Sequence, residues 1–161
     1  MRQITGIITI AIVIVAMIAA TGCKKEDGTY NINYLSATAL RHLGNNISYL
    51  DASCEISSRN YVAAHVLDWN FKLLDEDENV IIEISDSNYR SLPFKVIVQK
   101  TPIQAQIFGT IGFKTDDFVA GDIFNGSIPK RVSLTATLED ERGNTPNFTA
   151  SANVVFQELT D

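Results

Sequence analysis

The most regular pattern in the chain is an alternation of apolar and polar residues near its C-terminal end. It runs over 132–139 and again over 148–156, with turn-forming residues at 140–146 in between. A period of two is typical of a strand with one buried face, and Gly143 gives the connecting turn a residue that tolerates a positive φ. These residues therefore predict a hairpin.

Shorter apolar runs upstream predict further strands. They lie at 47–56, 63–73, 80–84, 94–99 and 103–113. In the run 63–73 we expect one apolar face, formed by Ala63, His65, Leu67, Trp69, Phe71 and Leu73. The acidic residues of 75–79 predict a turn, and Gly109 and Gly112 allow a bulge or bend in the last run. Residues 116–130 predict a loop whose apolar residues contact the core.

Residues 33–43 fit two patterns. Apolar residues spaced three to four apart and followed by Gly44 fit a short helix with a glycine stop. The alternation of Leu35, Ala37 and Ala39 with polar residues fits a strand instead. We favour a first strand here, followed by a turn.

About 7–8 short strands with turn signals between them predict an all-β, antiparallel sandwich. The segment 132–156 resembles the last hairpin of bacterial immunoglobulin-like domains, in its alternating strands and its Asp-x-x-Gly-Asn turn at 140–144. The resemblance implies an immunoglobulin-like β-sandwich over 31–161, although the Cys, Trp and Cys core of antibody domains is absent. A lipocalin-like barrel shares these local patterns and stays the alternative.

The N-terminal residues follow a different pattern. Arg2 precedes an apolar stretch whose richest part, 7–20, has 14 residues. That is the length of a signal-peptide core, whereas a membrane-spanning helix needs about 20 residues. Small residues at 19–22 follow, as a signal peptidase requires, and the next residue is Cys23.

This arrangement resembles the lipobox of bacterial lipoproteins, with Ala20 at the position where that family most often has Leu. The resemblance implies cleavage before Cys23, a diacylglyceryl thioether on its sulfur and acylation of its new amine by a chain such as palmitate. Each buried methylene contributes about 0.8 kcal/mol, so two or three chains anchor a protein stably. We therefore expect a lipoprotein signal peptide at 1–22, an acylated tether at 23–30 and the domain at 31–161.

The tether carries a second resemblance. Lys25, Glu26 and Asp27 directly follow the acylated position and are similar to the surface-export signal of Bacteroidetes-type lipoproteins. That resemblance implies transport to the outer leaflet of the outer membrane, with the domain facing the cell exterior. The alternative is a tether that is charged only to stay solvated.

Composition narrows the classes of partner. Removing residues 1–22 leaves 139 residues, a usual size for one domain, with 12 basic and 19 acidic side chains and a net charge of −7. This acidic excess argues against nucleic acid and against a polybasic grip on anionic lipid. Cys54 alternates with apolar neighbours, so we expect a buried and unreactive thiol that has no disulfide partner in the mature chain.

Residue patterns typical of catalysis are missing from the sequence. We expect His65 on an apolar strand face and His42 beside a turn, where neither is set up as a general base. The chain has no His-x-His pair, cysteine cluster, nucleophile elbow or phosphate-binding glycine loop. Its paired carboxylates lie in turn-like runs at 75–78 and 139–141. We therefore predict no enzymatic activity.

We expect no cofactor and interpret the loop acids as solvated charges; calcium is the alternative for which the chain offers candidate ligands. Loops at one end of a sandwich can pool the several oxygen ligands that Ca²⁺ takes. The candidates are Asp116, Asp117, Asp122, Asp140 and Asn144. No loop has the spacing of an EF-hand, so the site depends on which loops meet in space.

Together these features predict a lipid-anchored, non-enzymatic binding or structural module of an outer-membrane surface assembly. Acyl chains on Cys23 would hold it to the outer membrane, and its partner would be an unidentified surface protein or glycan. The alternatives are a glycan-binding surface lipoprotein or a calcium-stabilised adhesion domain. The aromatic candidates for sugar binding are Tyr30, Tyr34, Tyr49, Tyr61 and Tyr89.

Overall fold

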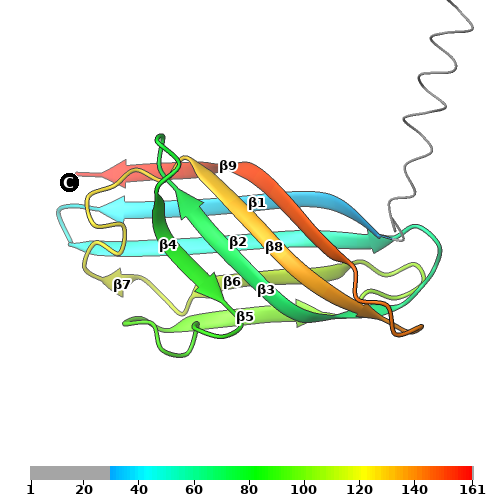
Figure 1. The fold of residues 1–161 in the computed structure, drawn as a ribbon. Helices are drawn as coiled ribbons and strands as arrows, with labels where there is room; N and C mark the ends of the chain where they lie inside the picture. The colour runs from blue at the N-terminus through cyan, green and yellow to red at the C-terminus, as the bar shows by residue number, and fades with distance from the viewer. Residues whose placement is uncertain (1–29, 161) are drawn as a thin grey trace, which may run out of the picture.

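The computed structural model describes residues 30–160, which form nine β-strands (Figure 1). The strands are β1 (Tyr30–His42), β2 (Ile47–Ser58), β3 (Ala64–Leu74), β4 (Val80–Ser85), β5 (Val96–Thr101), β6 (Gly109–Thr115), β7 (Val119–Ala120), β8 (Arg131–Asp140) and β9 (Asn147–Leu159). Within this range no helix has the length and apolarity needed to cross a bilayer.

The strands form two packed layers that share β9. One layer has the order β1-β2-β6-β5, with β7 paired to β2, and the other has the order β4-β3-β8-β9. β9 pairs antiparallel with β8 over its first half and parallel with β1 over its second half. Taken in chain order, the layers correspond to strands A-B-E-D and C′-C-F-G of an immunoglobulin sandwich.

The predicted all-β, immunoglobulin-like sandwich is therefore confirmed, with nine strands in place of the about 7–8 expected. The extra strand is β7, which has two residues and lies inside the segment that was predicted to be loop. The barrel alternative is wrong for residues 30–160, because the edge strands β4 and β5 do not pair with each other.

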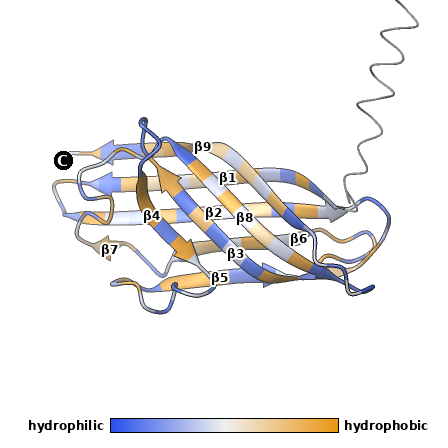
Figure 2. Cartoon of the chain, viewed as in Figure 1, coloured by the Kyte–Doolittle hydropathy of each residue, from blue (hydrophilic) through white to orange (hydrophobic). Residues whose placement is uncertain are grey.

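The core lies between the two layers. Trp69 and Phe71 of β3 and Phe113 of β6 are at most 2% exposed. The rings of Phe71 and Phe113 meet edge to face with their centroids 5.2 Å apart, an arrangement worth about 0.5–1.5 kcal/mol beyond the area it buries. Figure 2 shows the corresponding alternation of hydrophobic and hydrophilic bands along the strands.

Residues 33–42 belong to the strand β1, so the strand prediction for 33–43 is confirmed and the helix alternative is wrong. Ala37 and Ala39 are buried and Leu35 is half-buried, while the residues between them are exposed. The same face continues to Arg41, whose side chain is buried although it carries a charge. A buried cation needs partners, and those of Arg41 are described below.

β3 departs from its predicted alternation at a β-bulge. Its register with β8 shifts between Val66 and Asp68, which reverses the face to which the preceding residues point. His65 is therefore exposed, and the expectation that it lies on the apolar face is wrong. Its Nε2 atom lies 3.0 Å from Oε2 of Glu139 on the surface of the domain.

One strand is shifted along the sequence and another is shorter than predicted. β5 spans Val96–Thr101, two residues later than the predicted 94–99. β6 begins only at Gly109, because the segment 102–108 forms a loop in which Ile103 is buried. Gly112 is also not at a bulge. A Cβ atom there would lie 2.8 Å from the carbonyl oxygen of Ala52 on β2, so glycine lets the backbones of β2 and β6 approach closely.

The two ends of the sandwich are distinguished by β1, which starts at the entry end and finishes at the far end. The entry end, where β1 starts, holds the loops 59–63, 102–108 and 141–146 (Figure 1). The far end holds the turn 43–46 and the segment 116–130, with the turn 75–79 toward it.

Candidate functional site

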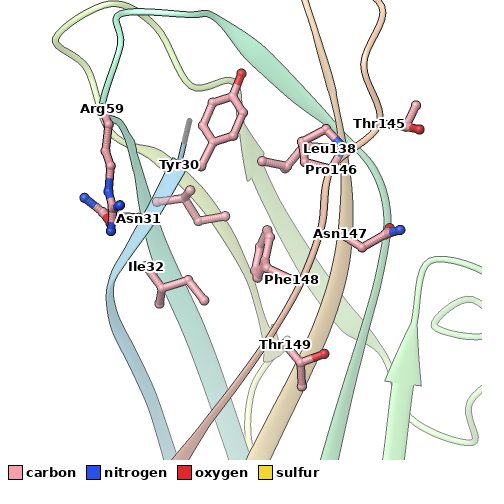
Figure 3. Close-up of a pocket in the computed structure, with 11 residues that line it drawn as sticks. Tyr30, Asn31, Ile32, Arg59, Leu138, Thr145, Pro146, Asn147, Phe148 and Thr149 are labelled. Carbon is pink, nitrogen blue, oxygen red and sulfur yellow. The ribbon is translucent and has the colours of Figure 1, made fainter. Parts of the chain in front are cut away.

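A cleft lies between β1 and β9 near the entry end (Figure 3). The two strands pair only over Ala37–His42 and Val154–Leu159. Toward the entry end they diverge, because β9 turns there to follow β8 in the other layer. We call this opening the seam, and define it by residues 30–36 of β1 and 147–153 of β9.

The seam encloses about 670 Å³ and has an apolar floor with a polar rim. Figure 3 shows the side chains of Ile32 on β1 and Phe148 on β9 projecting into the opening. The floor is completed by Ile56 and Leu138, and the rim includes Asn31, Arg59, Thr145, Asn147 and Thr149. A cleft with an apolar base and a few polar groups at its edge is typical of a binding site.

Backbone hydrogen bonds determine which main-chain groups face the seam. The amide of Leu138 donates to Pro146 O at 3.0 Å, and the amide of Val154 donates to Lys130 O at 2.9 Å. Even-numbered residues of β9 therefore face β8. The main-chain N–H and C=O groups of successive residues point to opposite sides of a strand. Those of odd-numbered residues such as Thr149 therefore point into the seam, where no strand of the described chain pairs with them.

Tyr30 stands at the entry-end limit of the seam. Its hydroxyl donates to Ala63 O at 3.4 Å. Burial, with the nearby carboxylates of Asp140 and Glu141, raises the pKa of Tyr30 to about 12. The phenol therefore stays neutral and keeps its capacity to donate across the physiological pH range.

The turn that borders the seam is held by its own side chains. Asp140 accepts hydrogen bonds from the amides of Arg142 and Asn144 at 2.9 and 2.8 Å, and from Nδ2 of Asn144 at 2.8 Å. The side-chain bond from Asn144, ahead of the backbone bonds, holds the pKa of Asp140 below its ordinary value. The seam therefore has one firmly shaped wall at the β8–β9 turn.

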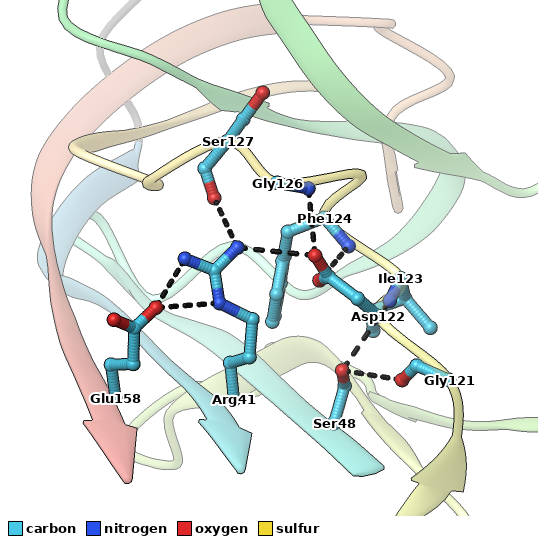
Figure 4. A network of polar contacts seen from close by, with 9 residues as sticks. All are labelled: Arg41, Ser48, Gly121, Asp122, Ile123, Phe124, Gly126, Ser127 and Glu158. Carbon is cyan, nitrogen blue, oxygen red and sulfur yellow. Dashed lines mark hydrogen bonds and ion pairs between the residues drawn. The ribbon is translucent and has the colours of Figure 1, made fainter. Parts of the chain in front are cut away.

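A second polar cluster lies at the far end and centres on Arg41 (Figure 4). Nε of Arg41 donates to Glu158 at 2.7 Å, Nη2 also bonds Glu158, and Nη1 donates to Asp122 at 3.1 Å and to Ser127 O at 3.3 Å. The guanidinium lies 5.5 Å from the centroid of the Phe156 ring. All three guanidinium nitrogens of Arg41 therefore donate hydrogen bonds, and two of them bond the same carboxylate.

Asp122 connects this cluster to the segment 116–130. Its carboxylate also accepts the amides of Phe124 and Gly126, at 2.9 and 2.7 Å. Phe124 is fully buried, as expected of a residue that holds this segment to the core, whereas Phe118 is 51% exposed. The cluster therefore fastens the far-end segment to β1 and β9.

The five candidate calcium ligands fall at opposite ends of the domain. Asp140 and Asn144 are in the β8–β9 turn, whereas Asp116, Asp117 and Asp122 belong to the far-end segment. Asp116 is paired with Lys95 and Asp122 with Arg41. The structure does not bring the five into one site, and residues 30–160 contain no cluster of three or more His, Cys, Asp or Glu suited to a metal ion. Calcium binding stays an untested alternative.

The remaining chemical candidates are placed as follows. Cys54 on β2 is fully buried, and burial, with a smaller effect of Glu55, raises the pKa of its thiol to about 12. His42 ends β1 beside the turn, where its Nδ1 accepts the amide of Asn45 at 3.3 Å. Cys23, Lys25, Glu26 and Asp27 lie outside the described residues.

In comparisons with known proteins, solved structures resemble this chain in fold alone. No protein-family model matches the chain, and no curated protein matches it. Among solved structures, the structural genomics target SoR45 has a TM-score of 0.49 and 8% identity over 80% of this chain and 88% of that one. Murine CRIg has a TM-score of 0.43 and 6% identity over 81% and 99%. A protein from Archaeoglobus fulgidus has a TM-score of 0.40 and 12% identity over 80% and 100%. No activity is transferred from these structures.

Proposed function

We propose that this protein is a lipid-anchored, non-enzymatic binding module of the outer-membrane surface, and that its binding site is the seam. In this proposal the acyl chains on Cys23 hold the protein to the outer leaflet, facing the exterior. The ligand of the seam is an extended segment of a partner protein in a surface assembly.

The observation that carries the proposal is that β1 and β9 each leave one edge without a hydrogen-bonded neighbour, on either side of a cleft with an apolar floor. An extended peptide recognises such an edge through main-chain hydrogen bonds and places alternate side chains in the cleft, which is β-strand addition. Each free edge of the seam has seven residues, 30–36 and 147–153. At about 3.3 Å per residue this offers roughly 23 Å of strand for pairing.

Acylation supports the same proposal by raising the effective concentration of partners. A protein confined to one leaflet meets neighbours in that membrane as if they were joined by a linker. A modest affinity for an extended segment then suffices for assembly at the surface.

The seam is tested by Thr149→Pro, with Thr149→Ala as its matched control. Proline removes an N–H that points into the seam and leaves the β8–β9 bonds intact, since these use the even-numbered residues. First, a photocrosslinker at Thr149 is used in intact cells to identify the contacted segment, with one at Lys72 on β3 as a control for chance contacts. A synthetic peptide of that segment is then titrated onto the purified protein.

We expect the alanine variant to bind this peptide as the unaltered protein does, and the proline variant to bind at least about tenfold more weakly, which corresponds to 1.4 kcal/mol. Equal binding by both variants, or capture of the same protein from Lys72, would show that the seam is not the site.

The membrane anchor is tested separately. We expect Cys23→Ala to abolish fatty-acid labelling and membrane retention. Replacement of Lys25, Glu26 and Asp27 by Ala should leave the protein acylated but shielded from protease added to intact cells. A triple variant that stays accessible to protease would contradict the export signal.

A glycan is the second candidate ligand, because the seam contains aromatic and amide side chains together. Tyr30 and Phe148 supply ring faces, and Asn31 and Asn147 supply hydrogen-bonding groups at the rim. A shift in an affinity gel that contains a polysaccharide, lost on Phe148→Ala but not on Phe118→Ala, would favour it over the peptide.

A further inference from the structure

Three large apolar side chains project from the entry end of the domain. Tyr61 is 64% exposed, Ile107 is 59% exposed and Phe108 is 54% exposed. Tyr61 belongs to the loop 59–63 and the other two to the loop 102–108, and Figure 1 shows both loops at the same end. Large side chains this exposed on neighbouring loops indicate a contact surface. The far end also exposes Leu43, Phe118, Ile128 and Leu159, by 40–51%, so exposure alone does not choose the end that meets a partner.

The loops that carry these side chains are fastened to one another. Ala64 and Ile103 exchange backbone hydrogen bonds of 2.9 and 2.8 Å. The amide of Glu141 donates to Ala63 O at 3.0 Å, which ties in the third loop. Val62 and Ile103 are buried next to the exposed residues. The three apolar side chains are therefore presented on a fixed base.

The point at which the chain enters the domain indicates what this surface meets. Six residues, 24–29, separate Cys23 from Tyr30, the first residue of β1. Even fully extended, this connection spans at most about 25 Å. This step rests on the proposed function, because Cys23 marks the membrane only if it is acylated. Given that anchor, the entry end is the end of the domain that faces the bilayer.

The distribution of charge favours the same orientation. In the three loops of the entry end the charged residues are Arg59, Glu141 and Arg142, and the loop 102–108 has none. The far-end loops instead concentrate acidic residues. These are Asp75, Glu76, Asp77, Glu78, Asp116, Asp117 and Asp122, with the basic residue Lys130. The segment 86–95 before β5 lies at the same end and adds Asp86, Arg90 and Lys95, so the far end keeps an acidic excess. An anionic bilayer therefore repels the far end and leaves the entry end free to approach.

We propose that Tyr61, Ile107 and Phe108 insert into the headgroup region of the outer leaflet and hold the domain upright on the membrane. Aromatic side chains favour this depth because their apolar rings and polar edges match it. The domain then has a fixed orientation, and the seam runs away from the bilayer along the side of the sandwich.

The test uses the acylated full-length protein in vesicles of phosphatidylethanolamine and phosphatidylglycerol that contain spin-labelled lipid. An environment-sensitive fluorophore is attached at Ile107→Cys, and in a control at Leu43→Cys, which is 50% exposed at the far end. Cys54 is fully buried and does not compete for the label. We expect a blue-shifted emission at 107 with quenching several-fold greater than at 43.

A second comparison separates insertion from simple proximity. With the fluorophore at Tyr61→Cys, the double variant Ile107→Ser and Phe108→Ser should lose the blue shift, while Leu43→Ser should keep it. Equal quenching at 107 and 43 on vesicles that the protein co-floats with would overturn the insertion and leave the anchor standing. Failure of the acylated protein to float with the vesicles would overturn the anchor and the insertion together.

Discussion

Replacement of Arg41 by Met removes the charge that holds the far-end segment while keeping a side chain of similar length. In the native protein the side chain of Arg41 is 8% exposed, whereas those of Asp122 and Glu158 are 26% and 36% exposed. The variant therefore leaves two partly buried carboxylates without their shared cation. The methionine can still pack on Phe156, so lost packing contributes little.

The size of the effect follows from this partial burial. Removing one partner of a fully buried ion pair costs about 3–5 kcal/mol. Water reaches both carboxylates here, and Asp122 keeps its two backbone donors, so we expect a loss of about 2 kcal/mol in the free energy of unfolding. For a domain of this size that lowers the melting temperature by roughly 6–10 °C.

The matched control is Lys95→Met. Lys95 also pairs with an aspartate of the far-end segment, Asp116, but its side chain is 75% exposed, so its removal should cost less than about 0.5 kcal/mol. Urea unfolding followed by tryptophan fluorescence measures both, because Trp69 is fully buried in the core. If Arg41→Met loses no more stability than Lys95→Met, then the cluster of Arg41 does not fasten the segment.

Three further outcomes are expected. Gly112→Ala should cost about 1–3 kcal/mol in urea unfolding, because its Cβ would press on the backbone of Ala52, and an unchanged midpoint would contradict that close approach. The pKa of Asp140 is lowered in the folded state by Asn144, so its stabilising contribution is complete above the ordinary aspartate pKa of about 4 and is lost as the pH falls through the folded value. Melting temperatures should therefore drop below about pH 4, and less steeply in Asp140→Asn; parallel pH profiles would argue against this assignment. The Cys54 thiol should resist a thiol reagent in the folded protein and react fully in denaturant, and rapid native labelling would mean that the core opens there.

Alternation was sufficient to predict most of the strands. The hairpin of β8 and β9, the strand character of 33–43 and the burial of Trp69 and Phe71 all follow from a period of two, which is a local property of the sequence. The same local rule failed at His65. A bulge changes the period by one residue, and the shift arises from the pairing of β3 with β8, which no local pattern records.

The candidate site depends on contacts between residues that are even farther apart in the sequence. The seam exists because β9 leaves one layer for the other, and nothing in the alternation of 148–156 marks where its partner changes from β8 to β1. The burial of Arg41 could have been predicted, since the alternation places it on the same inward face of β1 as Ala37 and Ala39. Its partners Asp122 and Glu158 are 81 and 117 residues away in sequence, so only the fold identifies them.

The parallel pairing of β1 with β9 also determines how the domain bears mechanical load. β1 begins at the entry end, while the C-terminal end of β9 lies at the far end, and the two strands are bonded side by side over Ala37–His42. A pull between the N-terminal end of β1 and the C-terminal end of β9 acts along both strands, so it strains all of these hydrogen bonds together in shear. Rupture then requires several bonds to fail at once, whereas peeling a hairpin apart breaks them one by one. The strand with which the described residues begin is thus held against being drawn out along its own axis.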